Sequence, residues 1–385
     1  MKLVYCINAY PRPQSRTLTI LGWLAKNQIK YIYVLPGFRP SLNKLFRRFL
    51  PSICSDYYQA RLIDGLFLAL SIYPSLIWQS IFRRRSCVIF VCFESWELYP
   101  FLSIYRFMRL AKVVVDLGYP AADISAASLP ARYIERVTSV EQSLNRSDIS
   151  LLVESEQQCT RVRGRLGKPA IFAHFVLEST GLADPVAKAV HGLPDFLDPC
   201  SRYILFRGTL NMESGIPDTA RSFSAFREKH PDFSLDLIIH GSGELKPALI
   251  ELLDSLQHVY YFSDFLEPAE LSQLMRGASA IVGQFNLLSP RPFLTIPHKF
   301  VESLRLGKLY LTPFLPPTAY YLEKLLDSGN LLRIKRSRDP IFDWLSILHE
   351  DVSLCESPLI QAVSMDVLDR MGSINHRSLT SSILS

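Results

Sequence analysis

Two glycine-containing turns in the second half of the chain carry the features of a phosphate-binding site. Gly208 follows the apolar run 203–207, and Gly241 and Gly243 follow the apolar run 234–240. Such a turn can bring its backbone close to a ligand, which only glycine permits without a steric clash. The helix expected after each turn offers unpaired N–H groups to a phosphate. Because open α/β sheets bind ligands at the carboxyl ends of their strands, two such turns in one domain predict a phosphate-bearing ligand.

A second set of chemically useful residues lies in one predicted helix. Pro297 suits its first turn and Gly307 suits its C-terminal cap. Lys299 and Glu302 are three residues apart, so both lie on one face of this helix. A carboxylate there can accept hydrogen bonds from two vicinal ribose hydroxyls, and a lysine can reach a diphosphate. On spacing alone, a solvent-exposed charge ladder that continues to Arg305 is the favoured interpretation.

The elements that must position these residues alternate between strands and helices. In the second half, the apolar runs that read as strands are 203–208, 234–241, 259–265, 280–286 and 308–313. In the first half, the corresponding runs are 3–8, 31–37, 87–93, 113–118, 149–155 and 170–176. Strands that are apolar on both faces and alternate with helices are typical of a parallel sheet covered by helices. The sequence therefore predicts an α/β protein with two Rossmann-like domains.

Length and composition support this division into two domains. A chain of 385 residues exceeds what one ordinary hydrophobic core organises. Hydrophobic residues make up 48% and charged residues 20%, which is a globular composition and excludes a disordered chain. Glycine and proline gather between the two strand–helix series, so we expect a linker at 186–202. The expected domains are then 1–185 and 203–370, followed by a tail, 371–385, that packs back on the first domain.

Cysteine usage and the N-terminus indicate the cellular compartment. The chain has seven cysteines, an odd number, and no Cys-x-x-Cys pair, so neither a disulfide framework nor a zinc cluster is expected. There is no Asp-x-Asp motif for a metal-bound diphosphate. The first apolar run is too short for a signal peptide and lacks a small-residue cleavage site. These features predict a reduced, cytoplasmic protein that needs no metal or other cofactor.

Basic and bulky apolar residues alternate in the segment 44–85. Its arginine clusters, 47–48 and 83–85, lie among Leu, Phe, Ile and Trp, which favours an anionic membrane surface over nucleic acid as a partner. The apolar stretch 62–82 is interrupted by Pro74, and we weigh a buried helix pair and an interfacial helix about equally. A transmembrane span is the least favoured interpretation, because it would split the first α/β domain.

Residues 203–313 carry a string of motifs in a family-specific order and spacing. These motifs are 206–210, 213–216, 239–243, 262–265, and 297–302 together with 307–308. In this respect the chain resembles the retaining GT-B glycosyltransferases, the large family that includes sucrose synthases and bacterial mannosyltransferases. The last motif is similar to the family's Pro-x-Lys-x-x-Glu helix. The resemblance extends over roughly 1–335 and implies two domains facing a cleft, the first binding an acceptor and the second a nucleotide-sugar donor.

The resemblance also implies roles for individual residues of the donor domain. Glu302 would bind the donor ribose, and the loop that contains Asp264 and Phe265 would flank the nucleotide base. The backbones that would approach the nucleotide and its phosphates are those of Gly208, Gly241 and Gly243.

Three positions depart from the family pattern. Thr209 stands where the family often has arginine, and Ser214 stands where it often has lysine. Those two cations normally hold the diphosphate. Leu294 stands where many members have a second glutamate, although the Pro-x-Lys branch often lacks it. The candidate substitutes for the missing cations are Arg207, Arg291 and Lys299.

The first domain of the family commonly supplies a histidine near the acceptor, and no histidine occupies the matching place, 113–120. Asp116 and Glu94 are the catalytic candidates at nearby strand ends, along with Glu97, and Asp116 reads equally as a loop-capping residue. Three histidines close to strand or helix ends are interpreted as structural hydrogen-bond donors, namely His174, His240 and His298.

Together these features predict transfer of a sugar from a nucleoside-diphosphate sugar to a glycan or lipid-linked glycan, in polysaccharide or glycoconjugate biosynthesis. Retention at the anomeric carbon is what the resemblance implies. Two alternatives stay open, which are a GT-B-like protein that binds a nucleotide or glycan without turnover, and a sugar-nucleotide epimerase. The missing cations at Thr209 and Ser214 motivate the first alternative. The expected location is the cytoplasm, with peripheral attachment to the inner face of the membrane as a further candidate.

Overall fold

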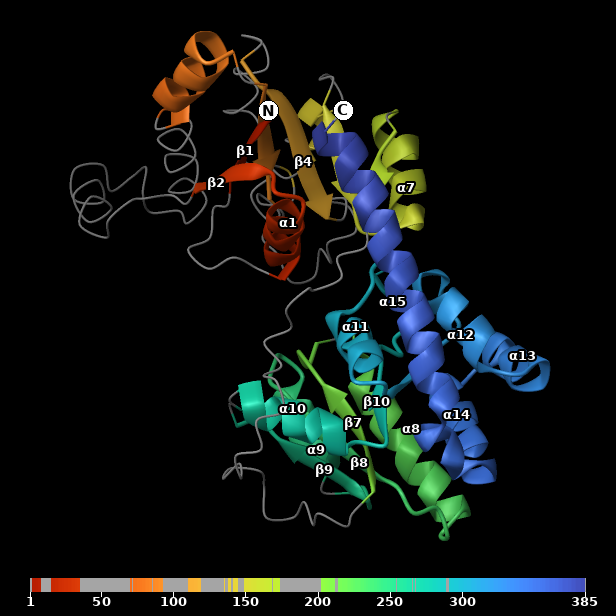
Figure 1. Ribbon diagram of the computed structural model, residues 1–385. Coiled ribbons are helices and arrows are strands. Elements are labelled where there is room, and N and C mark those ends of the chain that lie inside the picture. Colours follow the sequence, from red (N-terminus) through yellow and green to blue (C-terminus); the bar gives the residue numbers. More distant parts are fainter. Residues whose placement is uncertain are drawn as a thin grey trace, which may run out of the picture. The chain divides into compact units, whose positions relative to one another are not determined.

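The computed structural model divides the chain into two α/β units (Figure 1). Unit 1 comprises Met1–Glu178 and Met371–Ser385, and unit 2 comprises Ser179–Arg370. The residues that the structure describes are 2–7, 15–34, 70, 72–84, 86–92, 110–118, 135, 138–139, 141–144, 149–167, 169–173, 202–211, 214–253, 255–264, 266, 268–288 and 291–384.

Unit 1 is built on a parallel sheet with the strand order β2-β1-β3-β4-β5-β6. The strands are β1 (Leu3–Ile7), β2 (Lys30–Val34), β3 (Cys87–Val91), β4 (Lys112–Gly118), β5 (Ser150–Val153) and β6 (Ile171–Phe172). Every residue of β1 and β3 is buried, because both faces of the sheet are covered. The continuous apolar runs in the sequence therefore correspond to central parallel strands, as predicted.

Alternate residues of β1 enter two separate apolar cores, since side chains alternate between the faces of a strand. The odd-numbered residues pack with the helical segment 72–77 and with α7 (Glu156–Leu166). The even-numbered residues pack with α1 (Ser15–Lys26) and with the end of the chain. Within this second core, Trp23 Nε1 donates to His376 Nδ1 at 3.4 Å. The end of α15 (Pro358–Leu379) is thereby part of unit 1.

The segment 72–84 combines features of both interpretations weighed for the apolar stretch. Ile72 and Leu76 are buried in unit 1, as a core helix requires. The π-helical turn η1 (Trp78–Phe82) contains no buried residue. The remainder of the predicted membrane-surface segment, 44–69, 71 and 85, lies outside the described residues. Among the described helices, none is long and apolar enough to cross a bilayer.

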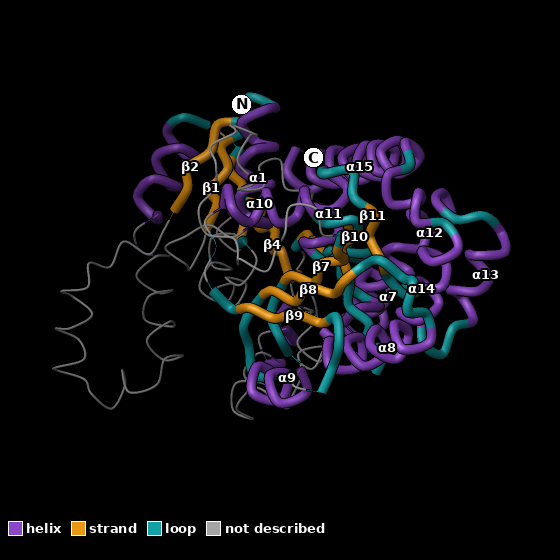
Figure 2. The backbone as a smooth tube through the Cα atoms, turned by 90° about the horizontal axis from the view of Figure 1, so that it is seen from below, coloured by secondary structure: helices purple, strands orange, loops and turns teal. Residues whose placement is uncertain are grey.

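Unit 2 contains the second parallel sheet, with the strand order β11-β10-β7-β8-β9 (Figure 2). The strands are β7 (Tyr203–Arg207), β8 (Asp236–His240), β9 (Val259–Phe262), β10 (Ala280–Val282) and β11 (Leu309–Leu311). From β7 the chain adds β8 and β9 on one side and then β10 and β11 on the other. The topological switch point therefore lies between β7 and β10, where open α/β sheets bind their ligands.

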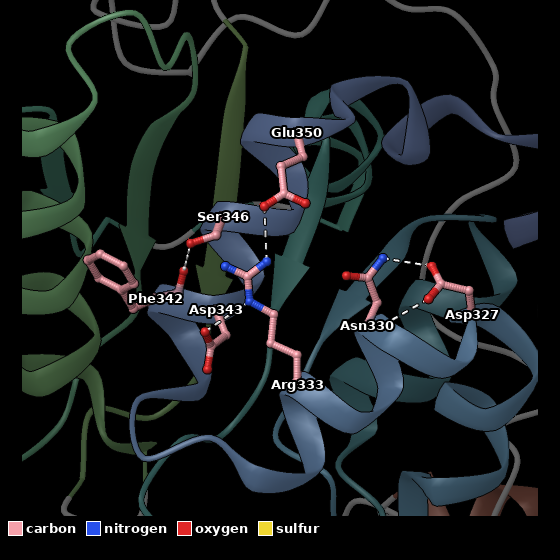
Figure 3. A network of polar contacts seen from close by, with 7 residues as sticks. All are labelled: Asp327, Asn330, Arg333, Phe342, Asp343, Ser346 and Glu350. Carbon is pink, nitrogen blue, oxygen red and sulfur yellow. Dashed lines mark hydrogen bonds and ion pairs between the residues drawn. The ribbon is translucent and has the colours of Figure 1, made fainter.

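The helices of unit 2 connect and cover these strands. They are α8 (Ile216–Lys229), α9 (Lys246–Leu253), α10 (Pro268–Gly277), α11 (His298–Arg305), α12 (Ala319–Leu325), α13 (Ser328–Arg336), α14 (Pro340–Glu350) and the first part of α15. Helix α14 packs on α8 through the edge-to-face rings of Phe226 and Phe342, 5.0 Å apart. On its other side, Arg333 of α13 donates to Asp343 and Glu350 of α14, each at 3.1 Å (Figure 3).

Candidate functional site

The carboxyl ends of three neighbouring strands of unit 2 bring polar and aromatic residues together. Arg207 ends β7, His240 ends β8 and Phe262 ends β9. Arg207 is in register with His240, and His240 is in register with Phe262, so the three lie in a row at one edge of the sheet. This edge is where the sequence places the glycine turns, and helix α11 adds two charged residues to it.

Lys299 of α11 reaches the switch point of the sheet. Its side chain is buried, and its Nζ donates to the carbonyl oxygen of Gly283, just beyond β10, at 3.4 Å. The same Nζ lies 3.8 Å from the ring centroid of Phe206, near the end of β7. A Cβ atom added to Gly208 would lie 3.9 Å from this Nζ. The ammonium group thus lies between the ends of β7 and β10, the two strands on either side of the switch point.

The surroundings of Lys299 lower the pKa of its side chain. Burial lowers the pKa of Lys299 from 10.5 to about 7, with a smaller effect from the nearby Arg207 guanidinium. The Glu302 carboxylate acts in the opposite direction. A buried ammonium that faces polar backbone and an aromatic ring is costly without an anion, and a bound phosphate would supply one.

Glu302 is buried beside Lys299 and forms an ion pair across the site. Arg207 Nη1 donates to Glu302 Oε2. Lys299 and Glu302 are both 8% exposed, so the solvent-exposed ladder favoured by spacing alone is wrong. Arg207, predicted as a substitute cation, is committed to Glu302. Of the other two substitutes, Lys299 lies at the switch point, and the side chain of Arg291 lies outside the described residues.

The glycines of the two turns are needed for contact between the turns themselves. Gly241 has φ +148°, and a Cβ there would lie 1.9 Å from the carbonyl oxygen of Gly208. A Cβ on Gly243 would lie 2.3 Å from the carbonyl oxygen of Leu210. Leu210 N–H also donates to the Ser242 carbonyl at 3.1 Å. This packing between the turns explains why Gly241 and Gly243 must be glycines. Gly208 instead faces Lys299. The approach of all three glycines to a nucleotide stays a prediction.

The positions that depart from the family pattern carry no positive charge in the structure. Thr209 is exposed beside Gly208. Ser214 is buried, and its hydroxyl donates to the Asn211 carbonyl at 2.6 Å, which organises the turn before α8. Leu294 is buried. The charge needed to bind a diphosphate must therefore come from other residues at this edge.

Two residues at the same edge have buried polar atoms without a hydrogen-bond partner in the described part of the chain, namely Nδ1 of His240 and Oε1 of Gln284. Nε2 of His240 donates to the carbonyl oxygen of Asp264 at 3.1 Å, and burial lowers the pKa of the ring. Buried polar atoms are nearly always satisfied, so these two mark positions for ligand or water. The sequence interpretation rated His240 as structural and missed Gln284, whose only signal is its place just after an apolar run.

The loop predicted to flank the base is only partly described. The Asp264 side chain is exposed, and Ser263 Oγ accepts a hydrogen bond from Lys246 Nζ at 2.9 Å. Phe265 lies outside the described residues. Lys246, at the start of α9, is a further cation near this loop that sequence reasoning did not single out.

Of the catalytic candidates of unit 1, Asp116 is the one that the structure describes. Asp116 lies within β4, before its last residue, and is completely buried. Its carboxylate is one of several influences that raise the pKa of the Cys92 thiol, of which burial is the largest. Glu94, Glu97 and His174 lie outside the described residues. A catalytic role for Asp116 or Glu94 stays a prediction.

Proteins of known structure share this architecture. No protein-family model matches the sequence, and no curated protein matches it. Solved structures do match over nearly the whole chain. One is described as trehalose-6-phosphate from E. coli bound with UDP-2-fluoro glucose, with a TM-score of 0.59, 13% identity, and coverage of 98% of this chain and 97% of that chain.

Two further matches have similar scores. Anabaena Alr3699/HepE in complex with UDP-glucose has a TM-score of 0.59 at 12% identity, covering 99% of both chains. A trehalose-6-phosphate synthase studied for glycosyl transfer with retention has a TM-score of 0.56 at 13% identity, covering 97% of this chain and 96% of that chain. The predicted fold class is confirmed, because the chain has two Rossmann-like α/β units with parallel sheets, the architecture of the GT-B glycosyltransferases.

Proposed function

We propose that this chain is a glycosyltransferase that uses a nucleoside-diphosphate sugar as its donor. The observation that carries the proposal is the buried ammonium of Lys299, which lies between the ends of β7 and β10 beside the Arg207–Glu302 ion pair. A cation at this position matches the negative charge of a diphosphate, and a carboxylate beside it matches the hydroxyls of a ribose. The structurally similar proteins bound with UDP-glucose or UDP-2-fluoro glucose support the same donor class.

In this mechanism, the residues of unit 2 hold the donor and stabilise the leaving group. Lys299 balances the negative charge that grows on the diphosphate as the bond to the sugar breaks. Glu302 holds the ribose, and Arg207 keeps the Glu302 carboxylate oriented. Transfer with retention is part of the proposal, supported by the similar trehalose-6-phosphate synthase described with that stereochemistry. The proposed acceptor is a glycan or a lipid-linked glycan that binds to unit 1.

A panel of nucleoside-diphosphate sugars tests this function. We expect one donor class to raise the melting temperature, because a ligand at 100 times its dissociation constant adds about 2.7 kcal/mol of stability. The same donor should release free nucleoside diphosphate only when an acceptor is present. Release of an isomerised nucleotide sugar without acceptor would identify an epimerase. Stabilisation without any turnover would identify a non-catalytic binding protein, and no stabilisation by any donor would reject the site itself.

We further propose that unit 1 rests on an anionic membrane surface through a membrane-contact patch. The patch consists of Trp78, Ile81, Phe82, Arg83 and Arg84, all of them exposed. The three apolar side chains are 51%, 57% and 68% exposed in that order, which is unusual for residues so large. Apolar side chains beside arginines suit the boundary between lipid headgroups and acyl chains. A lipid-linked acceptor would then meet the enzyme at the surface of the bilayer.

Flotation with liposomes tests the membrane-contact patch. The protein should float with vesicles that contain an anionic lipid, and less so as salt is raised, because each arginine near the surface adds about 1 kcal/mol. The double variant R83E/R84E should release it. The matched control is R161E/R163E, which makes the same charge change on exposed positions of α7. Equal flotation of both variants, or no flotation of the unchanged protein at low salt, would reject the patch.

A further inference from the structure

A cluster of metal-ligating side chains lies in unit 2, away from the donor site. The atoms of His230, Asp232 and His349 that could ligate a metal all lie within 4.8 Å of one another. Nε2 of His349 and Oδ2 of Asp232 are 3.0 Å apart. The rings of His230 and His349 lie with their centroids 4.7 Å apart, tilted by 51°. The proposed glycosyl transfer uses none of these residues.

The ends of two helices bring the three side chains together. His230 is the C-terminal cap of α8, and Asp232 follows in the next turn. His349 lies in the last turn of α14, the helix that packs on α8. The C-terminal end of a helix carries a partial negative charge, which favours a cation nearby. Two such ends and one carboxylate therefore make this a place where a positive charge is stabilised.

Aromatic packing holds both imidazole rings in place. Phe226 stacks on His230 with centroids 4.4 Å apart, and it meets His349 edge-on at 6.0 Å. Phe233 also meets His349 edge-on, at 6.1 Å. Ligands that are already positioned lose less conformational entropy when they bind a metal. The contacts thus prepare the cluster for coordination, although the neighbouring helices need them for packing as well.

The ring nitrogens of His230 take part in no hydrogen bond with the described residues, so they are available to a metal. Glu350, the nearest acidic neighbour of His349 in sequence, is committed to Arg333 at 3.1 Å and points toward α13 (Figure 3). The cluster therefore offers two imidazoles and one carboxylate, with room for water because Asp232 is exposed.

We propose that His230, Asp232 and His349 bind a divalent transition metal, with Zn²⁺ as the preferred ion. Two imidazoles and one carboxylate form a common zinc ligand set, in which water completes the tetrahedron. The metal displaces the proton between His349 Nε2 and Asp232 Oδ2 to the solvent, and His349 binds the metal as a neutral imidazole whose one proton is on Nδ1. Ligand atoms must approach to about 2.0–2.2 Å from zinc, which small side-chain rotations allow at helix ends. The ion would link the C-terminal ends of α8 and α14.

The sequence does not reveal this site, because no metal motif has its spacing. His349 is far along the chain from His230, and only the packing of α14 on α8 brings them together. The sequence predicted a protein without metal because its cysteines form no zinc cluster and it has no Asp-x-Asp motif. The cluster of His230, Asp232 and His349 contains neither feature.

Binding of Zn²⁺ and Co²⁺ to the full-length, tag-free protein tests the proposal. Zn²⁺ should raise the melting temperature, and Co²⁺ should give the visible absorption of a low-symmetry site with nitrogen ligands. Mg²⁺ at the same concentration should do neither, because it prefers oxygen ligands. Asp232→Asn should weaken Zn²⁺ binding by at least about tenfold, the scale seen even for groups that only support a ligand. The double variant H230N/H349N should lose both signals.

His258 provides a matched control, since its Nδ1 lies 3.1 Å from Asp236 with Arg227 beside it, and no second imidazole joins them in the part of the chain that the structure describes. His258→Asn should bind Zn²⁺ like the unchanged protein. Circular dichroism shows whether each variant is folded, and the Co²⁺ spectrum of the unchanged protein is a test that needs no variant. A protein that gives neither signal overturns the proposal. Signals that survive in H230N/H349N overturn it too, because the metal then binds elsewhere.

Discussion

Replacing Lys299 with methionine should stabilise the fold at neutral pH and weaken binding of a nucleoside diphosphate. The Lys299 side chain is buried, and burial lowers its pKa to about 7. In the unfolded chain a lysine keeps its proton up to about pH 10.4. Methionine fills a similar volume without any charge. Replacement of a whole buried ion pair by apolar residues of similar volume is often neutral or stabilising by about 1–4 kcal/mol, and removal of the single buried charge of Lys299 should act in the same direction.

The pH dependence of this effect has a definite sign. Between pH 7 and 10 the unfolded state binds more protons at Lys299 than the folded state does, so stability rises with pH over this window. Below pH 7 both states are protonated and the full penalty of burying the charge is present. The stability advantage of K299M should therefore be largest below pH 7 and should shrink toward pH 10. Denaturant unfolding at about pH 6, 7.5 and 9, from just below the folded-state pKa of about 7 to well above it, measures it.

Ligand affinity should move in the opposite direction. Loss of a charge-assisted hydrogen bond costs about 1.5–3 kcal/mol, so K299M should bind the nucleoside diphosphate roughly 10- to 100-fold more weakly. The bare nucleoside should bind almost unchanged. In the unchanged protein, affinity for the diphosphate should fall as pH rises above 7, because binding then requires uptake of a proton by Lys299.

Lys308 is a matched control for this experiment. Burial lowers the pKa of Lys308 as well. Lys308 comes just before β11, so it lies at the amino ends of the strands, whereas the donor site lies at their carboxyl ends. K308M should change the pH dependence of stability and leave diphosphate affinity unchanged. Equal affinity losses in both variants, or equal losses for nucleoside and diphosphate in K299M, would assign Lys299 a structural role only.

The strands of both sheets could be predicted because their signal is local. The run predicted as a strand at 203–208 is β7 (Tyr203–Arg207), and the run at 87–93 contains β3 (Cys87–Val91). An uninterrupted apolar run of this length must be buried on both faces, wherever the rest of the chain lies. The alternation with helices then selects a parallel sheet.

The state of the site residues depends on contacts that are distant in sequence. Spacing puts Lys299 and Glu302 on one face of α11, but it cannot say whether that face is buried. Burial comes from the ends of β7 and β10, where Phe206 and Gly283 contact Lys299, and from the ion pair with Arg207. A surface ladder and a buried site therefore have the same local pattern, and only the family resemblance favours the second.

The glycine turns are a second case in which the sequence pattern does not identify the neighbouring group. The need for glycine at Gly241 was predicted from a close backbone approach, and the structure does contain such an approach. A Cβ on Gly241 would meet the backbone of Gly208, and the approach of Gly241 to a nucleotide stays a prediction. A sequence shows that a side chain is absent, but it does not show which group occupies the space. Gln284 was missed because the sequence does not show that its Oε1 is buried without a hydrogen-bond partner among the described residues.

Replacing Glu302 with glutamine should weaken binding of nucleotides that carry a ribose and spare those that lack its hydroxyls. The buried Glu302 carboxylate accepts a hydrogen bond from Arg207 through Oε2, and it can accept others from a ribose. Losing the charge should cost about 1–3 kcal/mol of affinity for a nucleoside diphosphate. The fold should be affected less, because the Arg207 side chain is 28% exposed and stays hydrated when its partner is lost.

A cycle of two proteins and two ligands isolates the contact between Glu302 and the ribose. Calorimetry would compare the unchanged protein and E302Q with a nucleoside diphosphate and with its 2′,3′-dideoxy analogue. If Glu302 binds the ribose hydroxyls, either change alone weakens binding and the second adds little to the first. The control is R207M, which removes the ion pair and keeps the carboxylate, so its loss of affinity for the nucleoside diphosphate should be smaller than that of E302Q. Losses that simply add would show that Glu302 serves only as the partner of Arg207, and the ribose would then need another ligand at this edge of the sheet.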